Sequence, residues 1–267
     1  MGKSDYTYRD IIAALKRAGI RPGDTLFTHG NAGFFGRAQG AATKEELYAL
    51  FKKAIFEVIG PKGTWAQPAF SYSFFAKKPF DMNQTSSQMG LLAEMMREDP
   101  ESFRSNDPNF SVTAIGAHAV KLTKDVPAQS FGPNSFWDRF LKIGGKFCNF
   151  NFDSGSTFVH YVEKKLKVPY RYDKGFEGQV VENGRSVTKT FYHFVHSLEH
   201  PEHASDFRAF DALAKKKRKA VTSNLGRGQI LVLSAKDTLE LIKNELKKNP
   251  RLLTLEGAGT SDQQATE

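Results

Sequence analysis

The amino-acid sequence predicts an α/β fold in which a layered mixed sheet is flanked by helices within a single domain. Up to Lys174, segments with apolar residues at helical spacing alternate with short runs rich in β-branched and aromatic residues. Two alternating runs on either side of Asn183-Gly184 then predict an antiparallel hairpin, so the sheet should be mixed. A chain of 267 residues, 40% of them hydrophobic, can bury one sizeable core, and no repeat or linker divides it.

The first elements begin and end at recognisable signals. Residues 8–19 carry apolar side chains at helical spacing, and after a Pro-Gly turn the segment TLFTHG, residues 25–30, has the composition of a strand. The second predicted helix covers residues 43–59. It begins at a capping box formed by Thr43 and Glu46 and stops at Gly60-Pro61.

The rest of the chain continues this alternation. The elements predicted in its middle are a strand over 64–70, a helix around 88–97, a strand over 111–117, a helix over 134–141, a strand over 146–152 and a helix over 156–167. Those that follow are the hairpin over 176–195, a histidine-rich connection over 194–203, a helix near Ala209, a strand over 228–235 and a closing helix over 235–248. We expect the domain to span residues 1–254 and the polar residues 255–267 to form a disordered tail.

Composition limits where the protein works. No run approaches the roughly 18–20 apolar residues that a membrane span requires, and MGKSDYTYRD lacks the apolar core of a secretory signal. We therefore expect a cytoplasmic protein with no membrane partner. The single cysteine, Cys148, excludes an intrachain disulfide and a cysteine-based zinc site, and its apolar surroundings indicate a buried strand rather than a nucleophile.

The net charge of +9 favours an anionic partner, and coenzyme A is one such anion. The densest basic cluster is Lys215 to Lys219, in AKKKRKA, on a predicted helix. A run of this kind is usually a solvated helix face, so we do not expect nucleic acid to be the partner.

The most informative polar segment is DSGSTFVHYVE, residues 153–163, where a strand ends and a helix begins. Thr157, His160 and Glu163 recur every three residues and therefore share one helical face. A histidine there can accept a proton near neutral pH, and either Glu163 or Asp153 could orient its ring. Taken alone, the trio is also compatible with an ordinary structural histidine.

The same segment resembles a pattern of the aminoglycoside 3-N-acetyltransferase family: an aspartate, a small polar stretch, threonine, a hydrophobic pair, histidine and glutamate. Four other stretches match that family in the same order, and the resemblance covers roughly residues 7–245. They are VIGPKGT with QPAF (58–64 and 67–70), MGLLAE with the arginine-serine motif that starts at Arg104 (89–94 and 104–111), GPNS (132–135) and VPYR (168–171).

This resemblance implies an acyl-CoA-dependent N-acyltransferase that moves an acetyl or other acyl group directly from acyl-CoA to an amine, with no covalent enzyme intermediate. His160 would be the general base, and Thr157 or a nearby backbone N–H would donate to the oxyanion. It also implies the family's layered fold, and acetyl-CoA or another acyl-CoA as cosubstrate without a metal.

Coenzyme contacts are also implied by the resemblance. Arg104 would contact a phosphate, and Ser105 and Ser111 would lie beside the coenzyme, although ordinary turn hydrogen bonds explain both serines nearly as well. His29, Gly30 and Asn31 correspond to a family loop beside the coenzyme in which serines are common. For His29, a structural role is equally compatible with the sequence.

The sequence departs from the family pattern in two places, one at a turn and one in the segment that would border the acceptor. Asp107 stands where the family usually has a histidine before the proline of the arginine-serine motif. After the hairpin, residues 192–203 hold four histidines and two glutamates, where relatives that modify aminoglycosides carry several acidic residues. With the positive net charge and the abundant aromatic residues, this favours a neutral or anionic acceptor, such as an amino sugar on a nucleotide carrier.

The histidines at 193, 196, 200 and 203 also have spacings that could ligate zinc. A strand would turn His193 and His196 to opposite faces, and Pro201 would break a helix that aligned the others. We therefore expect no metal and interpret the segment as a loop that borders the acceptor pocket or as a solvated connection.

Two further functions remain open at this point. The acceptor could be a true aminoglycoside, which would make the protein an antibiotic-resistance enzyme. Alternatively, the site could have lapsed, leaving a non-catalytic basic protein that binds a polyanion through Lys215 to Lys219. Whether the chain forms a homodimer is also open.

Overall fold

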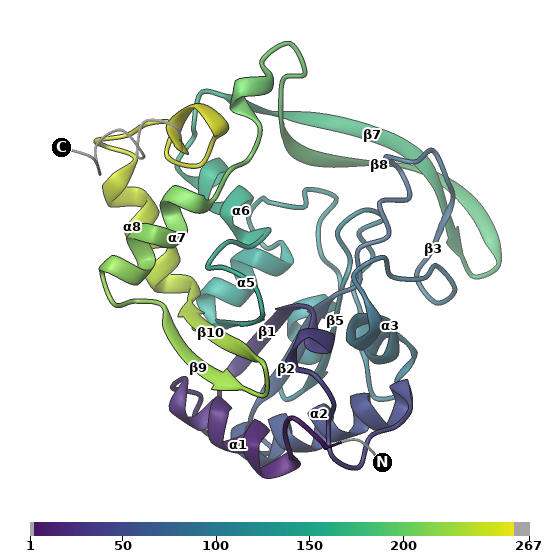
Figure 1. Cartoon of the computed structure of the whole chain (residues 1–267). Coiled ribbons are helices and arrows are strands. Elements are labelled where there is room, and N and C mark those ends of the chain that lie inside the picture. Colours follow the sequence, from purple (N-terminus) through teal and green to yellow (C-terminus); the bar gives the residue numbers. More distant parts are fainter. Residues whose placement is uncertain (1–2, 259–267) are drawn as a thin grey trace.

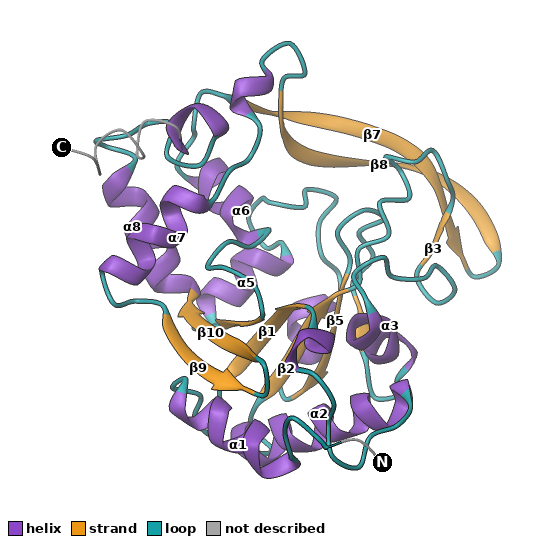
Figure 2. Cartoon of the chain, viewed as in Figure 1, coloured by secondary structure: helices purple, strands orange, loops and turns teal. Residues whose placement is uncertain are grey.

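The computed structural model describes residues 3–258. Within this range the main sheet has seven strands in the order β4-β5-β2-β1-β6-β10-β9 (Figures 1 and 2). Its centre is parallel, because β1 pairs in parallel with both β2 and β6, while β5, β10, β4 and β9 join in antiparallel pairs. The predicted mixed sheet flanked by helices is therefore confirmed.

The predicted helices and strands occur in the predicted order. The strands are β1 Thr25–Gly30, β2 Thr64–Pro68, β3 Phe80–Asp81, β4 Phe103–Arg104, β5 Val112–Gly116, β6 Lys146–Phe150, β7 Arg171–Glu182, β8 Arg185–His196, β9 Val221–Leu225 and β10 Gly228–Ser234. The α-helices are α1 Tyr8–Arg17, α2 Lys44–Ile59, α3 Leu91–Glu98, α4 Ala119–Thr123, α5 Phe136–Lys142, α6 Phe158–Lys165, α7 Arg208–Lys216 and α8 Ala235–Glu245, with short 3-10 turns η1 Ala32–Phe35 and η2 Pro201–His203.

Apolar side chains that alternate along the central strands form two cores, one on each face of the main sheet. Leu26 packs with Trp65 and with the apolar residues of α1 and α2. Its neighbour Phe27 points to the other face and packs with Phe147 and with α5, α6, α7 and α8. Helices therefore cover both faces, and the residues at the ends of the parallel strands are held between two packed layers (Figure 2).

A second sheet, in the order β3-β7-β8, consists mainly of a long hairpin that stands away from the main sheet (Figure 1). β7 and β8 pair along their full lengths, from Arg171 opposite His196 to Glu182 opposite Arg185. Asn183 and Gly184 both have positive φ angles, 52° and 75°, as a two-residue type I′ turn requires. The hairpin is confirmed and begins five residues earlier than predicted.

Several boundaries and short elements differ from the predictions. The helix expected around 88–97 begins only at Leu91, because Gly90 has a φ of 93°. β3 and β4 have two residues each, and three of the five residues of β9 are exposed, so none of them has a clear apolar pattern. Of the predicted tail, residues 255–258 form a helical turn with Ala258 buried, and residues 259–267 lie outside the described part.

The helices found along residues 3–258 are all too short or too polar to cross a lipid bilayer.

Candidate active site

The carboxyl ends of the parallel strands β1, β2 and β6 lie at one edge of the main sheet. From this edge the chain continues from β1 to α2 on one face, and from β6 to α6 on the opposite face. Loops that diverge in this way open a crevice between neighbouring strands, where ligands commonly bind in open α/β sheets. His29 and Gly30 pair with Asn149 and Phe150 here, so the predicted coenzyme loop lies beside the segment that starts at Asp153.

His160, Glu163 and Arg171 form a connected set of side chains at this edge. The Nδ1 atom of His160 lies 2.7 Å from Oε2 of Glu163, one turn further along α6. The same carboxylate oxygen lies 2.9 Å from Nε of Arg171, the first residue of β7. Arg171 also donates to Oγ of Ser205 at 2.6 Å, which ties the start of the hairpin to the segment before α7.

Burial and charge set the protonation states of this set. Glu163 is fully buried, which opposes ionisation, but its contacts with His160 and Arg171 outweigh burial and lower the pKa of the carboxyl. The pKa of His160 is lowered from its ordinary 6.5, first by burial and then by the nearby charge of Arg171. An ionised Glu163 accepts from Nδ1–H, which places the lone pair of a neutral His160 ring on Nε2.

A cavity of about 550 Å³ opens beside His160. Its lining is aromatic and basic, consisting of Phe75, Phe110, Phe131, His160, Arg171, Tyr172, Lys174, Phe176, His193, Phe194, Val195, His196, Leu198 and Ser205. Of the described residues that line it, none is Asp or Glu. A second, larger cavity of about 800 Å³, between Arg97 and Lys124, does not include His160 and lies outside the histidine set.

Of the two carboxylates that could orient His160, Glu163 contacts the ring. Asp153 instead accepts the backbone N–H of Gly155 at 2.7 Å, and burial raises the pKa of its carboxyl. Thr157 lies directly before α6, is half-buried, and makes no capping hydrogen bond with its side chain. Its hydroxyl therefore stays a candidate oxyanion donor, and Asp153 is better described as a turn residue.

The loop after β1 has the features of a close backbone approach. Gly30 has a φ of 107°, and a Cβ there would collide with the carbonyl oxygen of Phe150. Asn31 caps η1 by accepting from Gly33 N–H at 2.8 Å. His29 packs edge-on against Phe152 with ring centroids 4.5 Å apart, and burial lowers its pKa to about 4.

Three buried polar atoms lie near this crevice without a partner among the described residues: Nδ1 of His29, Oδ1 of Asn149 and Oγ of Ser156. His29 and Asn149 are register partners on β1 and β6, and the Asn149 amide also reaches the carbonyl of Gly155, next to Ser156. Unpaired buried polar atoms are costly, so the three mark a place where a ligand or water can supply hydrogen bonds. Asn149 and Ser156 have no signal in the sequence that singles them out.

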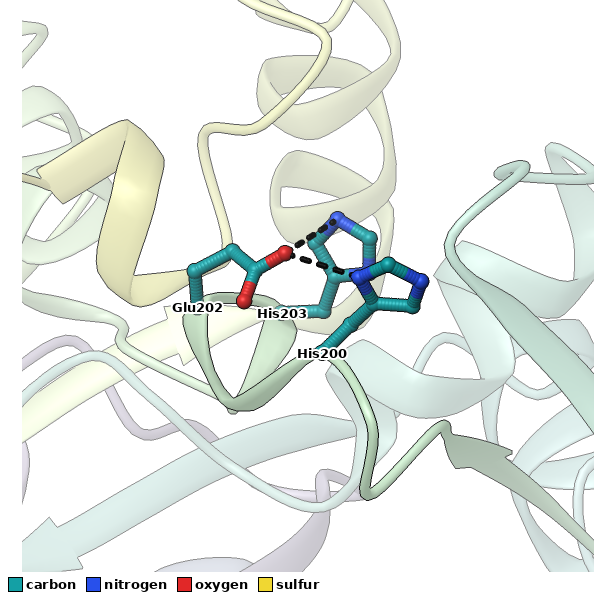
Figure 3. Close-up of side chains that lie close together, drawn as sticks. All are labelled: His200, Glu202 and His203. Carbon is teal, nitrogen blue, oxygen red and sulfur yellow. Dashed lines mark hydrogen bonds and ion pairs between the residues drawn. The ribbon is translucent and has the colours of Figure 1, made fainter.

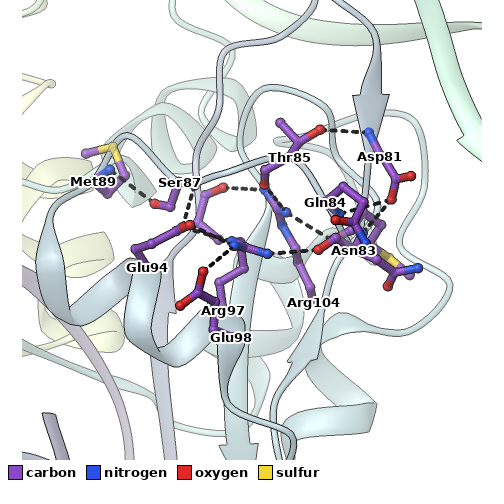
Figure 4. Close-up of polar contacts among 12 residues, drawn as sticks. Asp81, Asn83, Gln84, Thr85, Ser87, Met89, Glu94, Arg97, Glu98 and Arg104 are labelled. Atoms are coloured by element: carbon purple, nitrogen blue, oxygen red, sulfur yellow. Dashed lines mark hydrogen bonds and ion pairs between the residues drawn. The ribbon is translucent and has the colours of Figure 1, made fainter. Parts of the chain in front are cut away.

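Arg104, which is predicted to contact a phosphate, makes several hydrogen bonds within the protein and also lines the cavity of about 800 Å³. Its guanidinium donates to Oγ of Ser111 and to the backbone carbonyls of Met82, Thr85 and Ala69, as Figure 4 shows in part. Four of its five N–H groups are therefore used within the protein. Burial lowers the pKa of this guanidinium to about 10.

Ser105 and Ser111 share this internal role. Ser105, 1% exposed, accepts from Val112 N–H at 2.9 Å. Ser111, fully buried, donates to the carbonyl of Ala69 at 2.7 Å. All three residues make hydrogen bonds within the fold, and Arg104 also lines the cavity of about 800 Å³. Their contacts with the coenzyme stay a prediction.

A buried network on the other side of the cavity explains the unusual Asp107. Ser130 hydrogen-bonds both to Asp107 and, at 2.7 Å, to Nδ1 of His193, while Asn109 contacts Nε2 of His193 at 2.7 Å. Both ring nitrogens of His193 are therefore occupied. His196, half-buried, lies at the start of the connection and also lines the cavity.

Cys148 lies in the interior of β6 with no exposed surface, and burial raises the pKa of its thiol. The expectation that it is not a nucleophile agrees with this position, because the thiolate is the reactive form.

Known proteins resemble this chain in sequence and in fold. Residues 36–247 match the family model described as "Aminoglycoside 3-N-acetyltransferase". A curated relative, aminoglycoside N(3)-acetyltransferase III of Salmonella sp, is 24% identical over 210 residues, which cover 69% of this chain and 70% of the relative.

Two solved structures share the fold. Aminoglycoside acetyltransferase AAC(3)-Xa superposes with a TM-score of 0.78 at 22% identity, covering 91% of this chain and 93% of that chain. AAC-IIIb, solved as a binary complex with CoASH, has a TM-score of 0.77 at 20% identity and covers 91% of this chain and 96% of its own.

Proposed function

This chain belongs to the aminoglycoside 3-N-acetyltransferase family, and we propose that it transfers an acyl group from acyl-CoA to an amine with His160 as the general base. The observation that carries this proposal is the contact of His160 Nδ1 with the buried Glu163, which leaves Nε2 free beside the cavity. A neutral imidazole held in this tautomer can accept a proton at its exposed nitrogen.

In the proposed reaction the amine nitrogen attacks the thioester carbonyl carbon. Its proton passes to Nε2 of His160 as the C–N bond forms, and Glu163 stabilises the resulting imidazolium. The C–S bond then breaks, and the coenzyme thiolate leaves and takes a proton back from Nε2, giving an amide and a free thiol. Thr157 or a nearby backbone N–H would donate to the developing oxyanion.

We place the acyl-CoA in the crevice between the loops that follow β1 and β6. His29, Gly30 and Asn31 form one wall, and Gly30 lets this wall lie directly against the backbone of Phe150 on β6. The unpaired atoms of Asn149 and Ser156 lie toward α6 and can serve the polar amides of a pantetheine arm. The likeness to AAC-IIIb, described as a complex with CoASH, supports coenzyme A as the source of the acyl group.

The residues that line the cavity beside His160 indicate the charge of the acceptor that it accommodates. Its described residues include Lys174 and Arg171 but no carboxylate, and Arg171 is already paired with Glu163. A polycation would enter this cavity without an anionic partner, whereas aromatic rings and Lys174 suit a sugar with an anionic carrier. We propose a neutral or anionic amino sugar, nucleotide-linked amino sugars among them, as the acceptor. A true aminoglycoside is the second candidate, and it is favoured by the family match.

A panel of acceptors with acetyl-CoA distinguishes these candidates by the rate of thiol release. We expect kcat/KM to be highest for a nucleoside-diphosphate amino sugar, lower for the free amino sugar and lowest for gentamicin-type drugs. Lys174→Glu should lower kcat/KM for the anionic acceptor on the order of tenfold. Lys189→Glu, on the hairpin opposite Gly178, serves as the control, because Lys189 does not line the cavity.

Each other outcome has a definite meaning. A preference for gentamicin-type drugs would establish the resistance function and overturn our acceptor class. Failure to bind acetyl-CoA, with salt-sensitive binding of RNA instead, would favour the polyanion-binding alternative. In that basic run Lys215 pairs with Asp211 and Lys219 pairs with Asp237, while residues 216–218 are exposed.

A further inference from the structure

We propose that His200, Glu202 and His203 bind a divalent transition-metal ion such as Zn²⁺. The three side chains lie on the short turn that joins β8 to α7, and no step of the acyl transfer described above uses them. The proposal is independent of the acyltransferase function. It concerns a site on the connection next to the cavity.

The local backbone explains why these residues come together. Pro201 was expected to prevent the histidines from aligning, but it occupies the first position of the 3-10 turn η2. A 3-10 turn has about three residues per turn, so side chains three positions apart point in the same direction. The rings of His200 and His203 accordingly stack, with centroids 5.0 Å apart and planes 28° from parallel.

The ligand atoms converge on one point in space. Oε1 of Glu202 lies 3.0 Å from Nδ1 of His200 and 3.8 Å from Nε2 of His203 (Figure 3), and the three atoms lie within 4.8 Å of one another. Tetrahedral zinc with bonds of about 2.0–2.1 Å holds its ligands roughly 3.3 Å apart. The Glu202–His200 pair is already near this separation, and the site closes when side-chain rotation brings Nε2 of His203 nearer to the other two ligand atoms.

The turn is already ordered in this conformation. His203 N–H donates to the carbonyl of His200 at 3.0 Å, and Ala204 N–H donates to that of Pro201 at 3.0 Å. The His203 ring packs near Tyr170, with centroids 5.9 Å apart, and its side chain is only 13% exposed. The metal would thus meet a preformed pair of ligands.

The donor set indicates which metal binds. Two imidazoles and one carboxylate suit zinc, nickel or copper, whereas calcium and magnesium require mainly oxygen ligands. The side chains of His200 and Glu202 are 56% and 46% exposed, so water can occupy the fourth position. An open position of this kind is compatible with a binding site at the surface.

Metal binding would also fix one wall of the cavity. The same connection supplies Leu198 and Ser205 to the cavity lining, and Ser205 holds Arg171. A bound ion cross-links the connection between these two residues. We therefore expect thermal stabilisation of the protein by the metal, because a ligand that binds only the folded state shifts the unfolding equilibrium.

The test is calorimetric titration of the tag-free full chain, stripped with a chelator, with Zn²⁺ and separately with Mg²⁺. We expect one Zn²⁺ per chain, a raised melting temperature and no binding of Mg²⁺. His200→Ala and His203→Ala should each weaken zinc binding roughly tenfold or more, since even indirect ligand partners contribute on that order. His118→Ala and Glu199→Gln, which change residues outside the group, should bind like the unchanged protein.

Zinc binding that is undiminished in His203→Ala would overturn the proposal, as would equal losses in the control variants. The absence of zinc binding by the unchanged protein would overturn it too. Each readout is a binding or melting measurement, so none of these outcomes depends on enzymatic activity.

Discussion

Replacing His160 with alanine is expected to lower kcat/KM for acyl transfer by a factor of roughly 10²–10⁴, because the general base is lost. The variant should remain folded, since Glu163 keeps its ion pair with Arg171. Steady-state release of coenzyme thiol measures the rate, and a thermal melt measures the fold. Acetyl-CoA affinity should change little, because the ring acts on the amine rather than on the coenzyme.

The matched control is His118→Ala, at the start of α4, away from the residues that line the cavity. It should keep both activity and stability. A His160→Ala protein that melts normally and turns over near the original rate would show that His160 is a structural residue.

Replacing Glu163 with alanine is expected to affect both stability and rate. Removal of one partner of a buried ion pair leaves the other charge uncompensated, so the free energy of unfolding should fall by about 3–5 kcal/mol. Here the unpaired group would be the guanidinium of Arg171, whose side chain is 4% exposed. Denaturant unfolding curves of the two proteins give this difference.

Glu163→Gln separates the two effects, because it keeps the shape of the side chain. Its amide oxygen can replace Oε2, which faces both Nδ1 of His160 and Nε of Arg171, so the tautomer is kept while the negative charge that stabilises the imidazolium is lost. We expect kcat to fall on the order of 10²-fold in a protein that still folds. Glu199→Gln, at an exposed position, is the control. Full activity of Glu163→Gln would mean that the charge of Glu163 does not contribute to the rate.

Local signals in the sequence identified most of the fold. The capping box of Thr43 and Glu46 starts α2 at the predicted residue, and Asn183-Gly184 marks the hairpin turn. The elements that differ from the prediction, β3, β4, α4 and β9, are short. β3 pairs with the distant strand β7, whereas β4 and β9 pair with the strands that follow them, β5 and β10. Segments this short show little periodicity of their own.

The sequence predicts those contacts of the candidate site that join residues close together in the chain. His160 and Glu163 are one helical turn apart, and their contact follows from that spacing. The contact between Glu163 and Arg171 requires β7 to return to α6, and the bond of Asn109 to His193 joins residues 84 positions apart. Arg104 shows the opposite case, because backbone carbonyls from distant segments occupy its donors and no sequence motif reports them.

The histidine-rich connection, residues 194–203, differs from its prediction because of its local backbone geometry. In the sequence, Pro201 indicates that the helical alignment is broken, and it does end any regular α-helix. A 3-10 turn, however, tolerates proline at its first position and still aligns His200 with His203. The type of turn, rather than the residue content, decides whether the ligands meet.

The proposed mechanism requires a neutral His160 ring, and NMR of ¹⁵N-histidine-labelled protein reports this protonation state, with His160→Gln used to assign the resonance. We expect a neutral ring at pH 7 with the proton on Nδ1, and a pKa below the ordinary 6.5, because burial and Arg171 disfavour the charged form. A ring that is doubly protonated at pH 7, or one that carries its single proton on Nε2, would contradict the account.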